Sequence, residues 1–274
     1  MPETYQNVLQ TFSTPVVALI IALLVQAGAW VLQAKNNNAD YVDIAWSLCV
    51  AIIAALYLVD SGHICFTSIV LLVAPLLWYL RLSWHLVTRF NVKHEDGRYQ
   101  YLRKHWQLAG SNASVQFKFL LFFIFQAFLA WFFSFQVYLI LEQEQTVLWL
   151  DGLAFLLIVT SFVGVTISDA QLLKFKKAGK GGVCEKGFWR YSRHPNYFFE
   201  WLHWCAYPLL GFYLGALSDP YWWLLLSYPL WMFLFLWKIT GIPFNEEQNI
   251  RSKGDAYRRY QKTTNAFFPG KPRE

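Results

Sequence analysis

The residues best suited to chemistry lie in one short stretch, 187–200, where a basic and aromatic segment runs into the start of an apolar helix. Pro195 presets its own φ and lacks an N–H, so we expect that helix to begin near Asn196. A helix N-terminus carries unpaired N–H groups and a partial positive charge. Three basic side chains stand directly before it: Arg190, Arg193 and His194. This junction is therefore predicted to bind an anion such as a phosphate.

Three polar residues recur along the helix that this junction opens. Asn196, Glu200 and His203 are spaced i, i+4, i+7 and so share one face of an otherwise apolar segment. An acidic side chain at the centre of a membrane helix costs about 2.5 to 3.5 kcal/mol. One alternative is a loop at the membrane surface that leaves Glu200 in water. The alignment of three polar residues with a basic entrance favours a ligand site.

The composition indicates an all-α, polytopic membrane protein. Of 274 residues, 56% are hydrophobic, 19% aromatic and only 15% charged. A membrane-spanning helix needs about 17 to 25 apolar residues. Seven runs of about this length are predicted to be transmembrane helices: 15–32, 44–59, 65–84, 117–141, 147–167, 197–217 and 221–242. We expect one integral membrane domain, 1–274, with helices 1–4 within 1–141 and helices 5–7 with a tail within 147–274.

Alternate connections carry the basic charge. Lys and Arg gather in 85–116, in 168–196 and in the tail from Lys238, whereas 60–64, 142–146 and 218–220 contain none. The positive-inside rule then predicts seven spans with the N-terminus outside and the C-terminus in the cytoplasm, in the inner membrane if the protein is bacterial. The net charge of +6 lies on that face. It will attract anionic membrane lipids, and it also suits an anionic cytosolic cofactor.

The four cysteines are Cys49, Cys65, Cys184 and Cys205, and no two of them form a Cys-x-x-Cys pair. They are predicted to be small core residues rather than a disulfide framework or a metal site. We expect no metal and no nucleic-acid partner, and protein partners are left open. The first 14 residues lack the basic start of a signal peptide, so the first span is expected to stay in the protein.

Polar residues also mark the second and third apolar runs. Asp40 can cap the second helix, and Asp43 would lie in its first turn, close enough to the interior to act as a buried acid. Tyr79, Ser83 and His85 give the end of the third run unusual polar density, and Arg81 in the same stretch can snorkel toward water. The connection 89–99 is charged and is compatible with an ordinary solvated turn.

Charged residues follow the fifth and the last runs. If the fifth helix continues past residue 167, Asp169 and Lys176 lie along one face at its basic end. After the last run, a predicted helix break at 240–243 precedes an acidic pair that includes Glu247, and a basic, aromatic helix follows at 257–262. This tail is predicted either to lie on the inner leaflet or to fold back as the lid of a cytosolic cavity.

Three segments resemble the DUF1295 family, which belongs to the steroid 5-alpha-reductase superfamily. They are Ser-Asp-Ala-Gln-Leu at 168–172, Gly-Phe-Trp-Arg-Tyr-Ser-Arg-His-Pro-Asn-Tyr-Phe-Phe-Glu at 187–200, and Gly-Ile-Pro at 241–243 with Tyr-Arg-Arg-Tyr-Gln at 257–261. The resemblance covers nearly the whole chain. Its Arg-His-Pro-Asn-Tyr core is shared with sterol reductases. A close variant occurs in isoprenylcysteine carboxyl methyltransferases and phospholipid methyltransferases.

The resemblance implies a seven-helix reductase that binds NADPH in a cytosol-facing cavity. Such an enzyme reduces a carbon–carbon double bond conjugated to a carbonyl in a steroid- or lipid-like substrate. It implies that Asn196 and Glu200 lie nearest the nicotinamide and that Arg193 and His194 approach the phosphates. The full set of cofactor contacts expected from it is Asp169, Lys176, Arg190, Arg193, His194, Asn196, Tyr197, Glu200, Glu247 and Tyr257. Val165 stands where the family has an asparagine.

The catalytic residues expected from the resemblance lie in the N-terminal half. The steroid enzymes polarise the substrate carbonyl with a Glu and a Tyr, and Asp43 and Tyr79 are the candidates of comparable spacing in this chain. Tyr79 would donate a hydrogen bond to the carbonyl oxygen as negative charge develops there.

Three other classes of protein stay open. An S-adenosylmethionine-dependent methyltransferase would use the same basic junction together with the pair Glu246 and Glu247, but the segment around Asp169 and the residues Asn196 and Glu200 favour a reductase. A membrane di-iron oxidase would need several His-x-x-x-His clusters, which the six scattered histidines do not supply. A non-enzymatic channel or scaffold leaves the polar row on the sixth helix unexplained.

Overall fold

The computed structural model describes residues 2–62, 65–108, 110–143, 147–179, 181–213, 216–239 and 241–273, with side chains from residue 14 onward. Within these ranges the regular structure is entirely helical. The chain divides into two compact units, Met1–Glu144 and Gln145–Glu274. The expected halves, 1–141 and 147–274, fall one in each unit. We call them the first and the second unit and describe each by itself.

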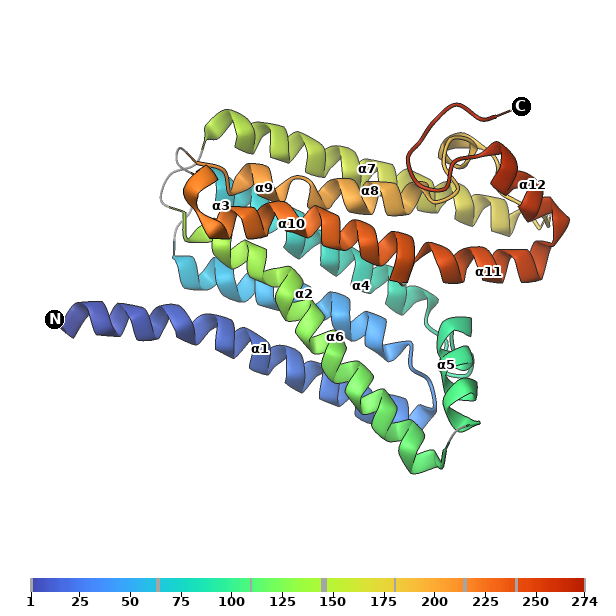
Figure 1. The fold of residues 1–274 in the computed structure, drawn as a ribbon, viewed down its shortest axis with the longest axis horizontal. Coiled ribbons are helices and arrows are strands. Elements are labelled where there is room, and N and C mark those ends of the chain that lie inside the picture. The colour runs from blue at the N-terminus through green and yellow to red at the C-terminus, as the bar shows by residue number, and fades with distance from the viewer. Residues whose placement is uncertain are drawn as a thin grey trace. The chain divides into compact units, whose positions relative to one another are not determined.

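The first unit contains four long helical rods and one short helix (Figure 1). Its elements are α1 (Pro2–Asn36), α2 (Tyr41–Ser61), α3 (Phe66–Leu71), η1 (Leu72–Leu77), α4 (Trp78–Arg89), α5 (Gly97–Gln107) and α6 (Asn112–Leu141). α2 packs against α1, α4 and α6. The short helix α5 lies at the end of the unit where α6 begins. The connections α1–α2, α4–α5 and α5–α6 therefore lie at the same end of the unit as α5.

The third rod is continuous but contains a wide turn. α3 and α4 are joined by η1, which is a π-helical turn that contains Pro75. Proline removes one N–H from the helix and crowds the carbonyl four residues earlier, and a locally widened turn relieves this. In the core of the unit, Ala29 and Ala45 let α1 and α2 approach the buried rings of Phe119 and Phe123 on α6.

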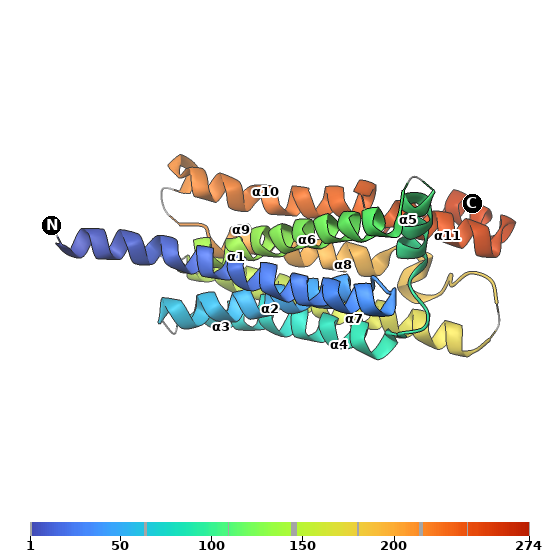
Figure 2. The ribbon, with the colours of Figure 1, turned by 90° about the horizontal axis from the view of Figure 1, so that it is seen from below.

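The second unit is built on α7 and α8, which run side by side (Figures 1 and 2). Its elements are α7 (Leu148–Lys177), η2 (Gly187–Arg190), α8 (Pro195–Trp204), α9 (Tyr207–Leu210), η3 (Ala216–Ser218), α10 (Pro220–Leu234), η4 (Phe235–Ile239), α11 (Ile242–Lys253) and α12 (Asp255–Thr263). Gly164 explains the close approach of α7 to α8, since a Cβ added there would lie 2.4 Å from Cδ1 of Phe199. The expected extension of the fifth helix past residue 167 is confirmed, because α7 continues to Lys177.

Six helical segments in the described ranges are long and apolar enough to cross a membrane, as expected of an integral membrane protein. They are Thr14–Asn36, Tyr41–Ser61, Phe66–Arg89, Asn112–Leu141, Leu148–Lys177 and Pro220–Lys253. The sixth predicted run, 197–217, is not one helix: α8 ends at Trp204, and α9 has only 4 residues. Pro208 accounts for the break, because its ring conflicts with the carbonyl of Trp204 four residues earlier. Residues 214 and 215 of this run lie outside the described ranges.

Candidate functional site

The start of α8 is the centre of the candidate site. Pro195 occupies the first turn of this helix, as the sequence predicts. Asn196 follows, and its Nδ2 donates to Oδ1 of Asp169 on α7 at 3.4 Å. That contact orients the amide, so Asn196 Oδ1 is left as an acceptor, and this buried atom has no hydrogen-bond partner in the described part of the chain. A buried acceptor without a donor is costly to the folded chain and marks a place for a ligand donor.

The polar row continues along α8. Trp204 Nε1 donates to Oε1 of Glu200 at 3.4 Å. His203 is fully buried, and its Nε2 lies 3.0 Å from the hydroxyl of Tyr207. The i, i+4, i+7 spacing thus places three polar side chains on one face of α8, as expected. Asn196 and Glu200 stand one turn apart, so their side chains project in the same direction.

The basic segment before α8 is fastened to α7. Gln171 Oε1 accepts a hydrogen bond from the backbone N–H of Phe188 at 3.0 Å, and Trp189 Nε1 donates to the carbonyl of Ser168 at 2.9 Å. Gly187 makes this fit possible: its φ is +62°, and a Cβ there would lie 2.4 Å from the Gln171 amide. The Ser-Asp-Ala-Gln segment therefore holds the loop in place while it presents Asp169.

Arg193 and His194 converge on one carboxylate. Arg193 Nε lies 2.7 Å and His194 Nε2 3.2 Å from Oε1 of Glu246 on α11, and Gln261 Nε2 donates to Oε2 at 2.7 Å. Arg193 also donates to the backbone carbonyls of Gln261 and Thr264. Burial lowers the pKa of His194, although the hydrogen bond and the charge of Glu246 oppose that shift. These contacts join α8 to the tail, and the expected contact with phosphates stays a prediction.

The tail after α12 folds back over the basic segment. Its place on the inner leaflet or as the lid of a cytosolic cavity stays a prediction. Ser192 Oγ donates to the carbonyl of Phe267 at 2.8 Å, and Gly270 N donates to the carbonyl of Tyr191 at 3.0 Å. The buried ring of Phe267 stands edge-on to Phe198 of α8, with 6.1 Å between ring centroids. In Figure 1 this red segment passes over the loop between α7 and α8.

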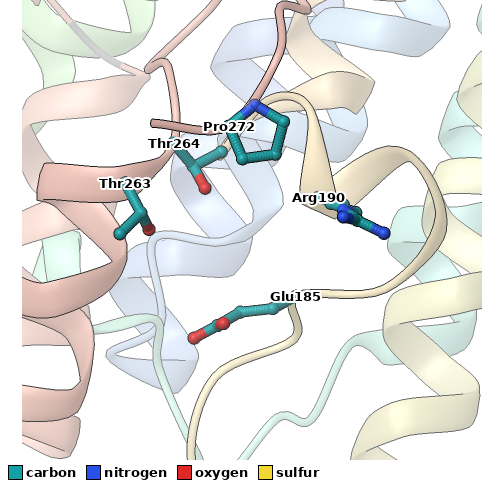
Figure 3. A pocket seen from close by; sticks show the side chains of 5 residues that line it. All are labelled: Glu185, Arg190, Thr263, Thr264 and Pro272. Atoms are coloured by element: carbon teal, nitrogen blue, oxygen red, sulfur yellow. The ribbon is translucent and has the colours of Figure 1, made fainter. Parts of the chain in front are cut away.

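A solvent-open pocket of about 320 Å³ lies between that loop and the tail (Figure 3). Glu185 and Arg190 come from the loop, and Thr263, Thr264 and Pro272 come from the end of α12 and the tail. Arg190 is exposed at this pocket, so its guanidinium is accessible to an anion. The pocket lies at the basic junction, but Asn196 and Asp169 do not line it.

The other predicted cofactor residues are spread over the same unit. The hydroxyl of Tyr197 accepts from Asn245 Nδ2 at 3.4 Å, and its ring stacks on that of His194 with centroids 5.4 Å apart. Lys176 is exposed in the last turn of α7. Glu247 is 59% exposed and pairs with Arg251, whereas Tyr257 is buried. The structure thus gathers some of the predicted contacts at the start of α8 and leaves Glu247 on the surface of α11.

In the first unit, Asp43 is held by the first turn of α5. Its Oδ2 lies 2.9 Å from Arg98 NH2, and its Oδ1 accepts from the hydroxyl of Tyr99 at 2.7 Å. Asp40 stands at the N-cap of α2 but makes no capping hydrogen bond with its side chain. Instead its Oδ1 accepts from the backbone N–H of Asp96 at 2.9 Å. The connection between α4 and α5 is therefore anchored to the start of α2 and is not an ordinary solvated turn.

Tyr79 is fully buried on α4, one helix away from this network. Its ring meets that of Trp46 on α2 edge to face, with centroids 5.7 Å apart. Trp46 Nε1 is a buried donor with no acceptor in the described ranges. The hydrogen bonds of Asp43 run to Arg98 and Tyr99, so the structure does not join Asp43 and Tyr79 by a hydrogen bond.

Comparison with known proteins assigns the family. A family model described as "Protein of unknown function (DUF1295)" matches residues 29–264. The chain belongs to the DUF1295 family. No curated protein and no solved structure showed significant similarity to it. The match spans both units of this DUF1295 protein, and membership is consistent with a place in the steroid 5-alpha-reductase superfamily.

Several features of this DUF1295 protein were not predicted. Trp46 was not among the candidate residues, because an unsatisfied indole N–H depends on packing and leaves no mark in residue spacing. Glu246 was assigned to the methyltransferase alternative, and its role as partner of Arg193 depends on a contact between residues 53 positions apart. All four cysteines are free, but Cys65 is exposed and caps α3 with its Sγ, so it is not the core residue expected.

Proposed function

We propose that this DUF1295 protein is a membrane-embedded, NADPH-dependent reductase. Its substrate is a steroid- or lipid-like compound with a carbon–carbon double bond conjugated to a carbonyl. The observation that carries the proposal is the buried Oδ1 of Asn196, an acceptor that no donor reaches in the described chain. A nicotinamide carboxamide supplies the N–H that this atom lacks.

The surroundings of Asn196 support this assignment. Asp169 accepts one hydrogen bond from the amide of Asn196, which favours the orientation that leaves Oδ1 as the free acceptor. Glu200, one turn further along α8, adds a second acceptor on the same face. A carboxamide has two N–H donors, and this pair of acceptors matches them.

The phosphates of the cofactor suit the basic end of the second unit. The N-terminus of α8 provides unpaired N–H groups, and Arg190 and Lys176 are exposed cations on the flanking elements. Arg193 is 10% exposed and compensated by Glu246, so we assign the phosphates first to Arg190, which lines the pocket of Figure 3. Cations that bind the 2′-phosphate, which NADH lacks, would make NADPH bind more tightly than NADH.

The bound cofactor would supply a hydride, and the chain's own residues would prepare the substrate. We assign Tyr79 as the hydrogen-bond donor to the substrate carbonyl, as the family resemblance implies. Its neighbour Trp46 offers a buried indole N–H for the same oxygen. Removal of one such donor costs other enzymes about 10²–10³ in rate. Asp43, bound to Arg98 and Tyr99, would act on the position of α2.

The proposed topology has seven crossings, with the N-terminus outside and the C-terminus in the cytoplasm. Six crossings correspond to the long apolar helices, and the broken segment α8–α9 would be the seventh. Broken helices occur at membrane depth where protein surrounds them or where they line a cavity. The Lys and Arg residues after α4, α7 and η4 support this orientation.

The methyltransferase alternative gains no support from the site. It needs Glu246 and Glu247 for the cofactor, but Glu246 is bound to Arg193 and Gln261, and Glu247 is paired with Arg251. Isothermal titration of the detergent-solubilised chain with NADPH, NADH and S-adenosylmethionine tests the proposal. NADPH should bind most tightly, and its advantage over NADH should shrink as salt rises. Binding of S-adenosylmethionine alone would reverse the assignment.

A further inference from the structure

A second pocket of the second unit, with a volume of about 410 Å³, combines a cationic side with an aromatic side. The residues that matter here are Arg193, Trp237, Gln261, Asn265, Phe268 and Arg273. They come from the basic segment before α8, from η4, and from α12 with the tail. This pocket is distinct from the one in Figure 3, although Thr264 borders both.

The charge of this pocket is positive. The lining contains two arginines and no carboxylate. The charge of Arg193 is met by Glu246 at 2.7 Å. Arg273 is exposed, and its NH2 donates to Oδ1 of Asn265 at 3.0 Å, which is a neutral partner. Among the residues that the structure describes, no carboxylate pairs with Arg273, so its guanidinium has N–H donors to offer, and an anion is the complementary ligand.

The opposite side of the pocket is apolar. Phe268 is 48% exposed, and its ring stacks on Phe233 of α10 with centroids 5.9 Å apart. Trp237 also stacks on Phe233, with ring centroids 5.5 Å apart. An exposed phenylalanine beside a tryptophan would be poorly placed in water, and it suits contact with hydrocarbon.

The position of Trp237 relates the pocket to the membrane. It stands in η4, in the last turns of the rod that α10 begins, and Lys238 follows it. Tryptophan gathers at the level of lipid headgroups, and lysine at the end of a span extends toward the water. In the proposed topology, the aromatic side would lie at the depth of the glycerol and upper acyl chains, and Arg273 would lie at the depth of the phosphates.

We propose that this pocket binds one anionic phospholipid, with the phosphate at Arg273 and the glycerol and first acyl carbons against Trp237 and Phe268. The volume suits a headgroup rather than a whole lipid. A free phosphate ion shares the Arg273 chemistry but gains nothing from the aromatic side. This lipid site is independent of the proposed reductase activity. It joins the folded-back tail to the membrane surface.

The test uses the full chain in a neutral detergent. Its melting temperature is followed while phosphatidylglycerol, phosphatidylcholine or inorganic phosphate is added. Phosphatidylglycerol should stabilise the parent, whereas phosphatidylcholine and inorganic phosphate should do so far less. Arg273→Gln should weaken the apparent affinity for phosphatidylglycerol about fivefold, the value of one basic residue at an anionic surface.

Arg258→Gln is the matched control, because Arg258 is an exposed arginine of α12 outside this pocket. It removes the same charge and should leave the titration near that of the parent. Phe268→Ser should also weaken phosphatidylglycerol binding, without a change of charge. It provides the test if Arg273→Gln folds poorly. Equal loss in Arg273→Gln and Arg258→Gln would overturn the site in favour of diffuse attraction. Equal stabilisation by inorganic phosphate would overturn the lipid as its occupant.

Discussion

Asn196 of α8 donates its amide N–H to the carboxylate of Asp169 on α7, at 3.4 Å, and leaves its own oxygen buried without a donor. The two residues are 27 positions apart, and the packing of Phe199 against Gly164 brings their helices together. A buried amide whose nitrogen is hydrogen-bonded but whose oxygen has no donor destabilises the fold unless a ligand donates to that oxygen. The proposed reductase site is built on this pair.

Glu246 should contribute most to the stability of the second unit. Glu246→Gln leaves the guanidinium of Arg193, which is 10% exposed, without a compensating charge. We expect a loss of about 3–5 kcal/mol, as measured by denaturant or thermal unfolding in detergent. Glu247→Gln is the control, because the Glu247–Arg251 pair is exposed and should change stability by about 1 kcal/mol or less. Similar losses of stability in both variants would show that the buried Glu246–Arg193 pair stabilises the unit no more than an exposed pair does.

Gly187 should be intolerant of a side chain. Gly187→Ala combines a φ of +62° with a Cβ that would lie 2.4 Å from the Gln171 amide. Gly179 has the same φ of +62° but open space around its Cα, so Gly179→Ala carries only the backbone cost of about 1 kcal/mol. The melting temperature should fall further for Gly187→Ala than for Gly179→Ala. An equal fall would show that the Gln171 contact adds nothing.

Asp40 should make the first unit sensitive to pH. Burial raises the pKa of Asp40 from an ordinary value of 3.8 to about 6. The hydrogen bond from the backbone N–H of Asp96 opposes this shift, and the charges of Asp96, Asp43 and Glu95 add to it. The folded state then binds this proton more tightly than the unfolded state, so the contribution of Asp40 to stability is fully present below about pH 4 and is lost as pH rises toward 6.

Asp40→Asn tests this dependence. The amide oxygen still accepts from the backbone N–H of Asp96, but the titration is gone, so the fall in stability between pH 4 and 6 should flatten. Unfolding curves of parent and variant across this range provide the measurement. An unchanged slope in the variant would assign the dependence to another group.

The proposed orientation predicts which side of the membrane each loop faces. Single cysteines at Lys104 on α5 and Lys262 on α12 should react with a membrane-impermeant thiol reagent only from the cytoplasmic side. A cysteine at Gln143, after α6, should react only from the other side. The four native cysteines are first replaced so that the signal is specific. Reaction of position 143 from the cytoplasm would contradict the proposed topology.

Much of the fold follows from local signals in the sequence. Pro195 marks the start of α8, and the apolar runs mark the long helices. The break after Trp204 also has a cause in the sequence, Pro208. The continuous apolar run 197–217 nevertheless led to the prediction of one unbroken helix. Local signals fail where distant residues meet: Arg98 reaches Asp43 across 55 positions, and Arg193 reaches Glu246 across 53. The orphaned atoms of Asn196 and Trp46 depend on packing, which residue type and spacing do not encode.

The central claim is that Asn196 accepts a hydrogen bond from the carboxamide of a nicotinamide cofactor. The most direct measurement compares the affinity of the parent for NADPH with its affinity for the 3-acetylpyridine analogue, which replaces the carboxamide N–H₂ by a methyl group. The parent should bind NADPH about tenfold more tightly, because the analogue leaves the acceptor unpaired. Asn196→Val should lose most of this preference, since only Glu200 is left to accept from the carboxamide. Equal affinities in the parent, or a full tenfold preference in the variant, would contradict the account.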